Sequence, residues 1–166
     1  MLRVLLLLLI ASPVAAAAPD WAMATLNDGL AAHRAQDYAR ARHDFRRLAG
    51  EGSAIAETML GVMHARGQGV PRDAATAATW WLRAANRGYP PAQFALAEAF
   101  AEGRGVGRDA ERAWVWARLA ATHGDTPTAK RAGALATSLA ARMDAATLAR
   151  LDRKRLAWRP WATLAE

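Results

Sequence analysis

The chain has 166 residues, of which 53% are hydrophobic and 22% are charged, and it contains no cysteine. This composition excludes a disordered chain, a collagen-like chain and a disulfide scaffold, and the length suits one domain or a short repeat array. Lysine and arginine total 22 against 15 for aspartate and glutamate, which gives a net charge of +7. Alanine is the commonest residue and β-branched residues are few. We therefore expect an all-α protein.

Residues 1–17 have the three parts of a secretory signal peptide. Arg3 gives a positive start, residues 4–10 are an unbroken apolar run, and small residues follow. We expect cleavage after Ala16 or Ala17. The alternative is an uncleaved anchor, which is disfavoured because a helix needs about 20 apolar residues to span a bilayer. The sequence therefore predicts a periplasmic or secreted protein.

A 36-residue repeat organises the rest of the chain. Shifting the sequence by 36 aligns Gly67 with Gly103 and Asp73 with Asp109. A fixed period of this length is typical of stacked helical repeats. The same shift aligns Ala56 with Ala92, Leu60 with Leu96, Gly69 with Gly105, Val70 with Val106, Ala77 with Ala113, Trp80 with Trp116 and Gly88 with Gly124.

Each unit is predicted to hold two helices joined by a turn. Apolar residues at helical spacing mark the first helix, and a Gly-x-Gly-Val segment ends it, because glycine readily adopts the left-handed cap conformation. Asp73 and Asp109 stand at the N-cap position of the second helix. Trp81 lies on the predicted buried side of that helix. Its counterpart is Ala117, but Trp114 lies three residues earlier on the same face.

The two units resemble the Sel1-like repeat. Their shared skeleton is A-x3-L-x6-G-x-G-V-x2-D-x3-A-x2-W-x3-A-A-x2-G, and the unit before them resembles a plain tetratricopeptide repeat with a shorter turn. Two positions depart from the family pattern. His64 replaces the usual tyrosine and is expected to be a packed, hydrogen-bonded ring, and Ala97 replaces the glycine that matches Gly61. The resemblance implies a right-handed α-solenoid of helix-turn-helix repeats with a C-terminal helical cap.

The chain divides into segments at the points where the 36-residue repeat begins and ends. A cap is expected because the last repeat would otherwise expose its apolar flank. Its second helix is predicted to carry Leu148, Leu151 and Leu156 on one face. The predicted segments are a signal peptide (1–17), repeats over 21–124 (about 21–52, 53–88 and 89–124), capping helices (125–158) and a tail (159–166).

The chain offers little chemistry of the kind that enzymes use. Ser53 and Ser138 lie in no nucleophile elbow, and the sequence has no His-Glu-x-x-His motif. The glycine-rich residues 103–107 lack the preceding strand of a phosphate-binding loop and are predicted to be a turn. Glu98 and Glu102 are one helical turn apart and suggest paired acid–base carboxylates, but a solvated helical face is the favoured interpretation. We therefore predict no enzyme, no cofactor and no metal site.

The resemblance also implies a binding surface. In tetratricopeptide relatives the first helix of each pair lines the concave face, and positions beside its buried stripe contact ligands. The alternative for each such position is ordinary exposed helix surface. Among the residues assigned, Val62 and Phe94 are expected to be apolar anchors. The register assigns Leu30, Arg34, Thr58, Val62, Arg66, Phe94, Glu98 and Glu102 to the concave face.

The basic C-terminal segment is a second candidate surface. Its cations and tryptophans are typical of segments that bind anionic lipid or an acidic polymer such as peptidoglycan. The alternative is a capping helix whose arginines keep it soluble while the tryptophans pack down on it. Nucleic acid would suit the charge, but an exported chain rarely meets it. The residues concerned are Arg153, Lys154, Arg155, Trp158 and Trp161.

The sequence thus predicts an exported, non-enzymatic adaptor or regulator that binds a peptide or partner protein in its concave groove. The alternative is a cell-envelope surface binder that acts through the basic C-terminus. The resemblance implies adaptor roles in envelope signalling, export or polysaccharide assembly. It also includes cysteine-rich relatives linked to β-lactam binding and hydrolysis, but this chain lacks their cysteines and an activated serine, so we expect no turnover.

Overall fold

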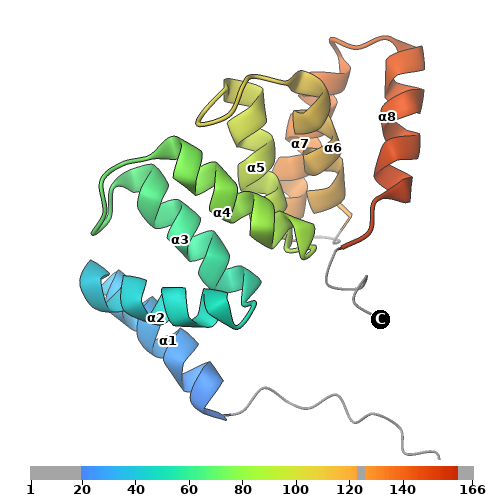
Figure 1. Cartoon of the computed structure of the whole chain (residues 1–166). Helices are drawn as coiled ribbons and strands as arrows, with labels where there is room; N and C mark the ends of the chain where they lie inside the picture. The colour runs from blue at the N-terminus through green and yellow to red at the C-terminus, as the bar shows by residue number, and fades with distance from the viewer. Residues whose placement is uncertain (1–19, 123–125, 161–166) are drawn as a thin grey trace, which may run out of the picture.

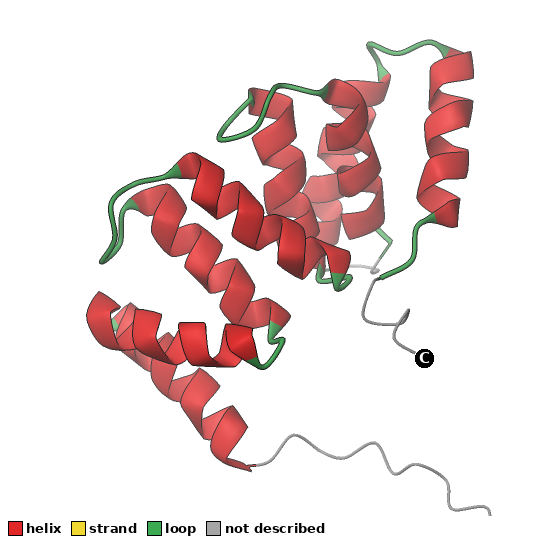
Figure 2. Ribbon diagram, in the orientation of Figure 1, coloured by secondary structure: helices red, strands yellow, loops and turns green. Residues whose placement is uncertain are grey.

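The computed structural model describes residues 20–122 and 126–160, with side chains from Thr25 onwards, so the predicted signal peptide lies outside the described residues. Every regular element in this part of the chain is a helix (Figure 2). Successive helices pack against one another from α1 to α7, and α8 packs mainly against α6 (Figure 1). The predicted all-α solenoid is therefore confirmed. The helices are α1 (Asp20–Arg34), α2 (Tyr38–Gly50), α3 (Ala54–Arg66), α4 (Ala74–Asn86), α5 (Pro90–Glu102), α6 (Ala110–Ala120), α7 (Pro127–Ala140) and α8 (Ala145–Ala157).

The two long turns, between α3 and α4 and between α5 and α6, are closed by the same bonds. Asp73 accepts hydrogen bonds from two amides at the start of α4, at 2.9 and 3.0 Å, and Asp109 caps α6 at 2.9 Å. Both predicted N-caps are confirmed. The guanidinium Nε of Arg72 donates to the carbonyl oxygen of Ala65 at 3.1 Å, and Arg108 makes the equivalent bond to the end of α5 at 3.1 Å. Each turn is thereby tied to the helix it leaves.

The second glycine of each turn brings neighbouring units close together. Gly69 and Gly105 have φ angles of 67° and 72°, in the left-handed region that favours glycine. A Cβ on Gly69 would lie 2.5 Å from the Cβ of Tyr38, the first residue of α2. A Cβ on Gly105 would overlap the carbonyl group of Ala74, the first residue of α4. Each long turn is therefore seated on the start of the preceding unit's second helix.

A glycine and a tryptophan fit together between α3 and α4. Trp81 is buried, and its indole lies so close to Gly61 that a Cβ there would overlap its Nε1 and Cδ1 atoms. In the next unit the equivalent positions are Ala97 and Ala117, and the bulky side chain is Trp114 instead. A tryptophan at 117 would meet the Ala97 methyl group. The alanine at 97 and the shift of the tryptophan from 117 to 114 are thus one coupled change.

Replacing Gly61 by alanine is expected to destabilise the protein by roughly 1–3 kcal/mol, because the new methyl group displaces the Trp81 ring in a packed core. Urea unfolding measures this change. The matched control is Gly133→Ala in α7, where nothing lies within 4 Å of the added Cβ, and it should be neutral or stabilising by up to about 1 kcal/mol. The double variant Gly61→Ala/Trp81→Ala should cost less than the sum of its single changes. Equal effects at Gly61 and Gly133 would contradict this packing.

Candidate functional site: a groove between α3 and α5

A pocket of about 330 Å³ opens between α3 and α5, the first helices of the second and third units. Val62 and Ala65 on α3 and Ala95 on α5 supply its apolar walls, and Trp81 reaches it from α4. Because Gly61 has no side chain, the large indole fits beneath the groove. The pocket therefore lies between two of the first helices that the sequence analysis assigned to the concave face.

The rim of the pocket is mostly positive. Arg66, Arg72 and Arg104 line it, together with the single carboxylate of Glu98. The Nε of Arg104 pairs with the Glu102 carboxylate at 2.7 Å. The Nε of Arg72 donates to the Ala65 carbonyl oxygen across the turn that follows α3. Arg66 makes no ion pair with any residue that the structure describes. The excess of positive charge therefore lies at the C-terminal end of α3.

Glu98 and Glu102 occupy different environments although they are one turn apart. The Glu98 side chain is 32% exposed and lies 3.5 Å from Nη2 of Arg131 on α7. Burial raises the pKa of Glu98, and the Arg131 charge offsets part of that rise. Glu102 is exposed and pairs with Arg104. Each carboxylate has its own arginine, so they form no acid–base pair. The prediction of a solvated face is right for Glu102 and wrong for Glu98.

The Glu98 carboxyl is expected to titrate above the usual pKa of glutamate, as followed by ¹³C NMR with Glu98→Gln used to assign the resonance. Because the folded state then holds the proton more tightly than the unfolded state, Glu98 costs stability as the pH rises from the usual glutamate range through its folded pKa. Arg131→Gln should raise the pKa further, since that guanidinium favours the carboxylate. A midpoint at or below the usual value would contradict the described burial.

Of the eight predicted contact residues, Val62, Arg66 and Glu98 meet in this pocket. Phe94 is 8% exposed and lies beneath the Arg131 guanidinium, 4.8 Å from its ring centroid, so the expectation of an exposed anchor is wrong. Thr58 is also buried, and its hydroxyl donates to the Ala54 carbonyl oxygen at 2.7 Å. Both side chains belong to the core. The remaining predicted positions line no part of this pocket: Leu30 is half-buried against the first unit's core, Arg34 is exposed on α1, and Glu102 is exposed on α5.

Sequence reasoning missed a buried carboxylate beside the groove helices. Glu57 on α3 is 0% exposed, and its Oε1 atom accepts from the Nε of Arg83 at 3.1 Å. Its Oε2 atom lies 3.3 Å from the Nε of Arg87. One unit later the equivalent residue is Gln93, equally buried, whose amide donates to the Ala85 carbonyl oxygen at 3.2 Å. Glu57 and Gln93 align in the 36-residue repeat and lie next to the apolar stripe. This repeated polar residue is the sequence feature that could have indicated a buried polar position.

The described residues hold no group of three or more His, Asp or Glu side chains suited to a metal ion. None of the described helices has the length and apolar character needed to cross a membrane. His64 is only partly buried, and the Nδ1 atom of its ring has no hydrogen-bond partner among the described residues. Burial lowers its pKa. The expected hydrogen-bonded ring is therefore wrong.

The Sel1 repeat family matches residues 54–89 and 90–125. The chain contains two Sel1 repeats. A similar solved structure is c5321, a protective antigen of uropathogenic Escherichia coli with an SLR fold, at a TM-score of 0.74 and 28% identity over 86% of this chain and 32% of that one. Another is a Sel1 repeat protein from Oxalobacter formigenes, at a TM-score of 0.61 and 26% identity over 66% of this chain and 45% of that one. The chain thus spans less than half the length of either, and no curated protein matches it.

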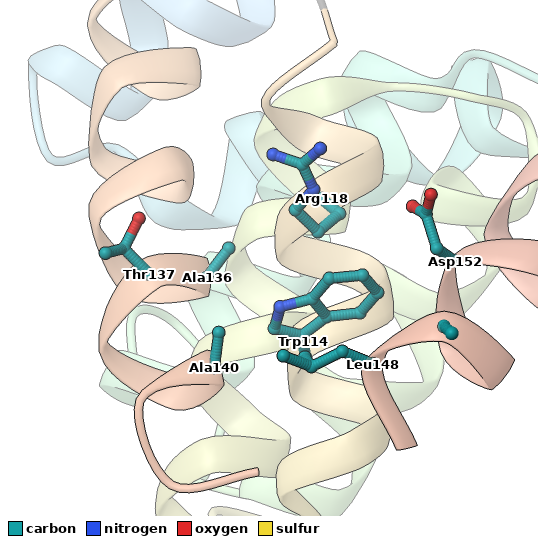
Figure 3. A pocket seen from close by; sticks show the side chains of 8 residues that line it. Trp114, Arg118, Ala136, Thr137, Ala140, Leu148 and Asp152 are labelled. Carbon is teal, nitrogen blue, oxygen red and sulfur yellow. The ribbon is translucent and has the colours of Figure 1, made fainter. Parts of the chain in front are cut away.

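Beyond the two Sel1 units, a further pocket of about 390 Å³ lies between α7 and α8. Figure 3 shows Trp114 of α6 at its base, with Ala136 of α7 on one side and Leu148 of α8 below. Arg118 and Asp152 stand at its rim, on α6 and α8. The sequence did not predict this pocket, because the cap helices fall outside the 36-residue period. Its opposite charges give it no net preference for a charged ligand.

The C-terminal segment mostly supports the Sel1 units by packing on them. Trp158 meets Trp116 edge-on at 6.1 Å between ring centroids, and Pro160 lies against Gly88. Leu151 is buried, but Leu156 is 58% exposed, so the prediction that it shares the buried face is wrong. Of the predicted surface residues, Arg153 and Lys154 are exposed, Arg155 pairs with Asp152 at 2.8 Å, and Trp161 lies outside the described residues.

Proposed function

We propose that this Sel1-repeat protein is an exported, non-enzymatic adaptor that binds a peptide segment or partner protein in the groove between α3 and α5. The observation that carries the proposal is the pocket itself, with apolar walls and a charged rim built from two neighbouring first helices. Packed helices hold these side chains in place before binding, which lowers the entropic cost of capturing a partner. Sel1-repeat proteins typically serve as protein–protein interaction scaffolds.

Export rests on the sequence pattern of residues 1–17, with its positive start, apolar run and small residues. The non-enzymatic assignment is supported by how the serines are used. The Ser53 hydroxyl caps α3 and accepts from the Ala56 amide at 3.3 Å. Ser138 is exposed on α7. Neither serine is activated for attack on a β-lactam or any other acyl group.

Val62→Asp is expected to weaken partner binding, because it places a carboxylate on the apolar wall of the groove. Affinity capture from envelope extract, after crosslinking in vivo, measures the effect. Val115→Asp is the matched control, since Val115 is also half-buried on a helix but lines a different pocket. Both variants should unfold cooperatively near the temperature of the parent. Equal capture by parent and Val62→Asp would contradict a groove-binding function.

A second candidate function, binding to the cell-envelope surface, is favoured by a pocket of about 420 Å³ between α6 and α8. Trp116 and Trp158 line it beside the exposed Lys154. The same variants discriminate the two functions. Loss of peptidoglycan or anionic-lipid co-sedimentation in Val115→Asp, with capture unaffected by Val62→Asp, would move the function to this surface.

A further inference from the structure

We infer that the segment held in the groove between α3 and α5 is acidic, and that one of its carboxylates binds between Arg66 and Arg72. This inference rests on the proposed function and names the chemistry of its partner. The balance of charge around the pocket favours an anionic partner. Glu98 is matched by Arg131 at 3.5 Å, and Glu102 by Arg104 at 2.7 Å. The carboxylate that lines the groove and the one beside it are therefore already compensated.

Two arginines remain without an acidic partner. Arg66 and Arg72 line the pocket, and neither makes an ion pair within the described part of the chain. Arg72 commits its Nε to the carbonyl oxygen of Ala65, which fixes the guanidinium at the mouth of the groove. Held in this way, a guanidinium loses less freedom when it binds than a mobile surface cation does. The unmatched charge is thus concentrated at the end of α3.

The walls of the pocket favour a peptide as the source of the anion. Ala65 and Ala95 are small and permit a close approach of backbone, and Val62 and Trp81 offer an apolar surface to a neighbouring side chain. A peptide that carries a carboxylate next to an apolar side chain would match both the arginines at the rim and the apolar walls. Arginine pairs with carboxylates through two parallel hydrogen bonds, which adds geometric specificity to the attraction between charges.

The repeat supplies an internal control for Arg72. Arg108 occupies the equivalent position and makes the same bond to its own helix end, at 3.1 Å in both cases. Arg108 does not line the groove between α3 and α5. Arg72→Gln and Arg108→Gln therefore remove the same bond within a turn, and only the first alters the groove.

The experiment selects random nonapeptides from a display library on the full chain, with counter-selection on Val62→Asp. The recovered peptides should be enriched in aspartate and glutamate. A synthetic copy of the strongest binder, followed by fluorescence anisotropy, should lose about tenfold in affinity for Arg66→Gln and for Arg72→Gln, as expected for loss of a charge-assisted hydrogen bond. Arg108→Gln should stay within about twofold of the parent. Replacing the peptide's glutamates by glutamine should reproduce the loss.

The other outcomes separate this inference from the proposed function. Peptides that depend on Val62 but show no acidic enrichment, or equal losses for Arg72→Gln and Arg108→Gln, would overturn the inference and leave groove binding intact. Failure to recover any peptide that depends on Val62 would overturn both. Binding of phosphatidylglycerol vesicles that depends on Arg66 and Arg72, without peptide binding, would overturn the inference and assign the arginines to a membrane surface.

Discussion

The approach of each long turn to the preceding unit determines the geometry of this protein. Gly69 and Gly105 lie where any side chain would overlap Tyr38 and Ala74, the residues that begin α2 and α4. Glycine alone permits this contact, and Gln68 strengthens the first copy by donating to the Tyr38 hydroxyl at 3.2 Å. Because each turn is seated in this way, consecutive units stack closely. The first helices α3 and α5 then come into contact, and the groove forms between them.

Within that stack, the two Sel1 units place their tryptophans differently, and two different pockets follow. Trp81 lies over Gly61 and reaches the groove between the first helices. The following unit has alanine at both equivalent positions. Its large side chain is Trp114, which lies beneath the pocket between α7 and α8. A repeat that is regular in sequence thus produces surfaces that are not equivalent. The pocket between α3 and α5 and the pocket between α7 and α8 therefore have different linings.

Much of this architecture could be predicted because it depends on local signals. Period, glycines and capping aspartates specify the helix pairs, and helical spacing correctly brought Val62 and Arg66 to one surface. The failures involve contacts between helices, which these local signals do not specify. Phe94 is buried against Ala120 of α6 and Ala132 of α7, with Arg131 of α7 over its ring, and α7 belongs to the cap. Glu57 was missed because its arginine partners come from the next helix, and a lone glutamate in a helix normally indicates solvent.

The proposed partner-binding site is the junction of α3 and α5. Chemical-shift mapping by ¹⁵N NMR, with a bound peptide titrated into the full chain, tests it most directly. Binding at this junction should place the largest changes on the amides of Val62, Ala65 and Ala95 and on the indole N–H of Trp81. Changes centred instead on the α6–α8 pocket beside Trp116 would contradict it, since that pocket shares no lining residue with the groove.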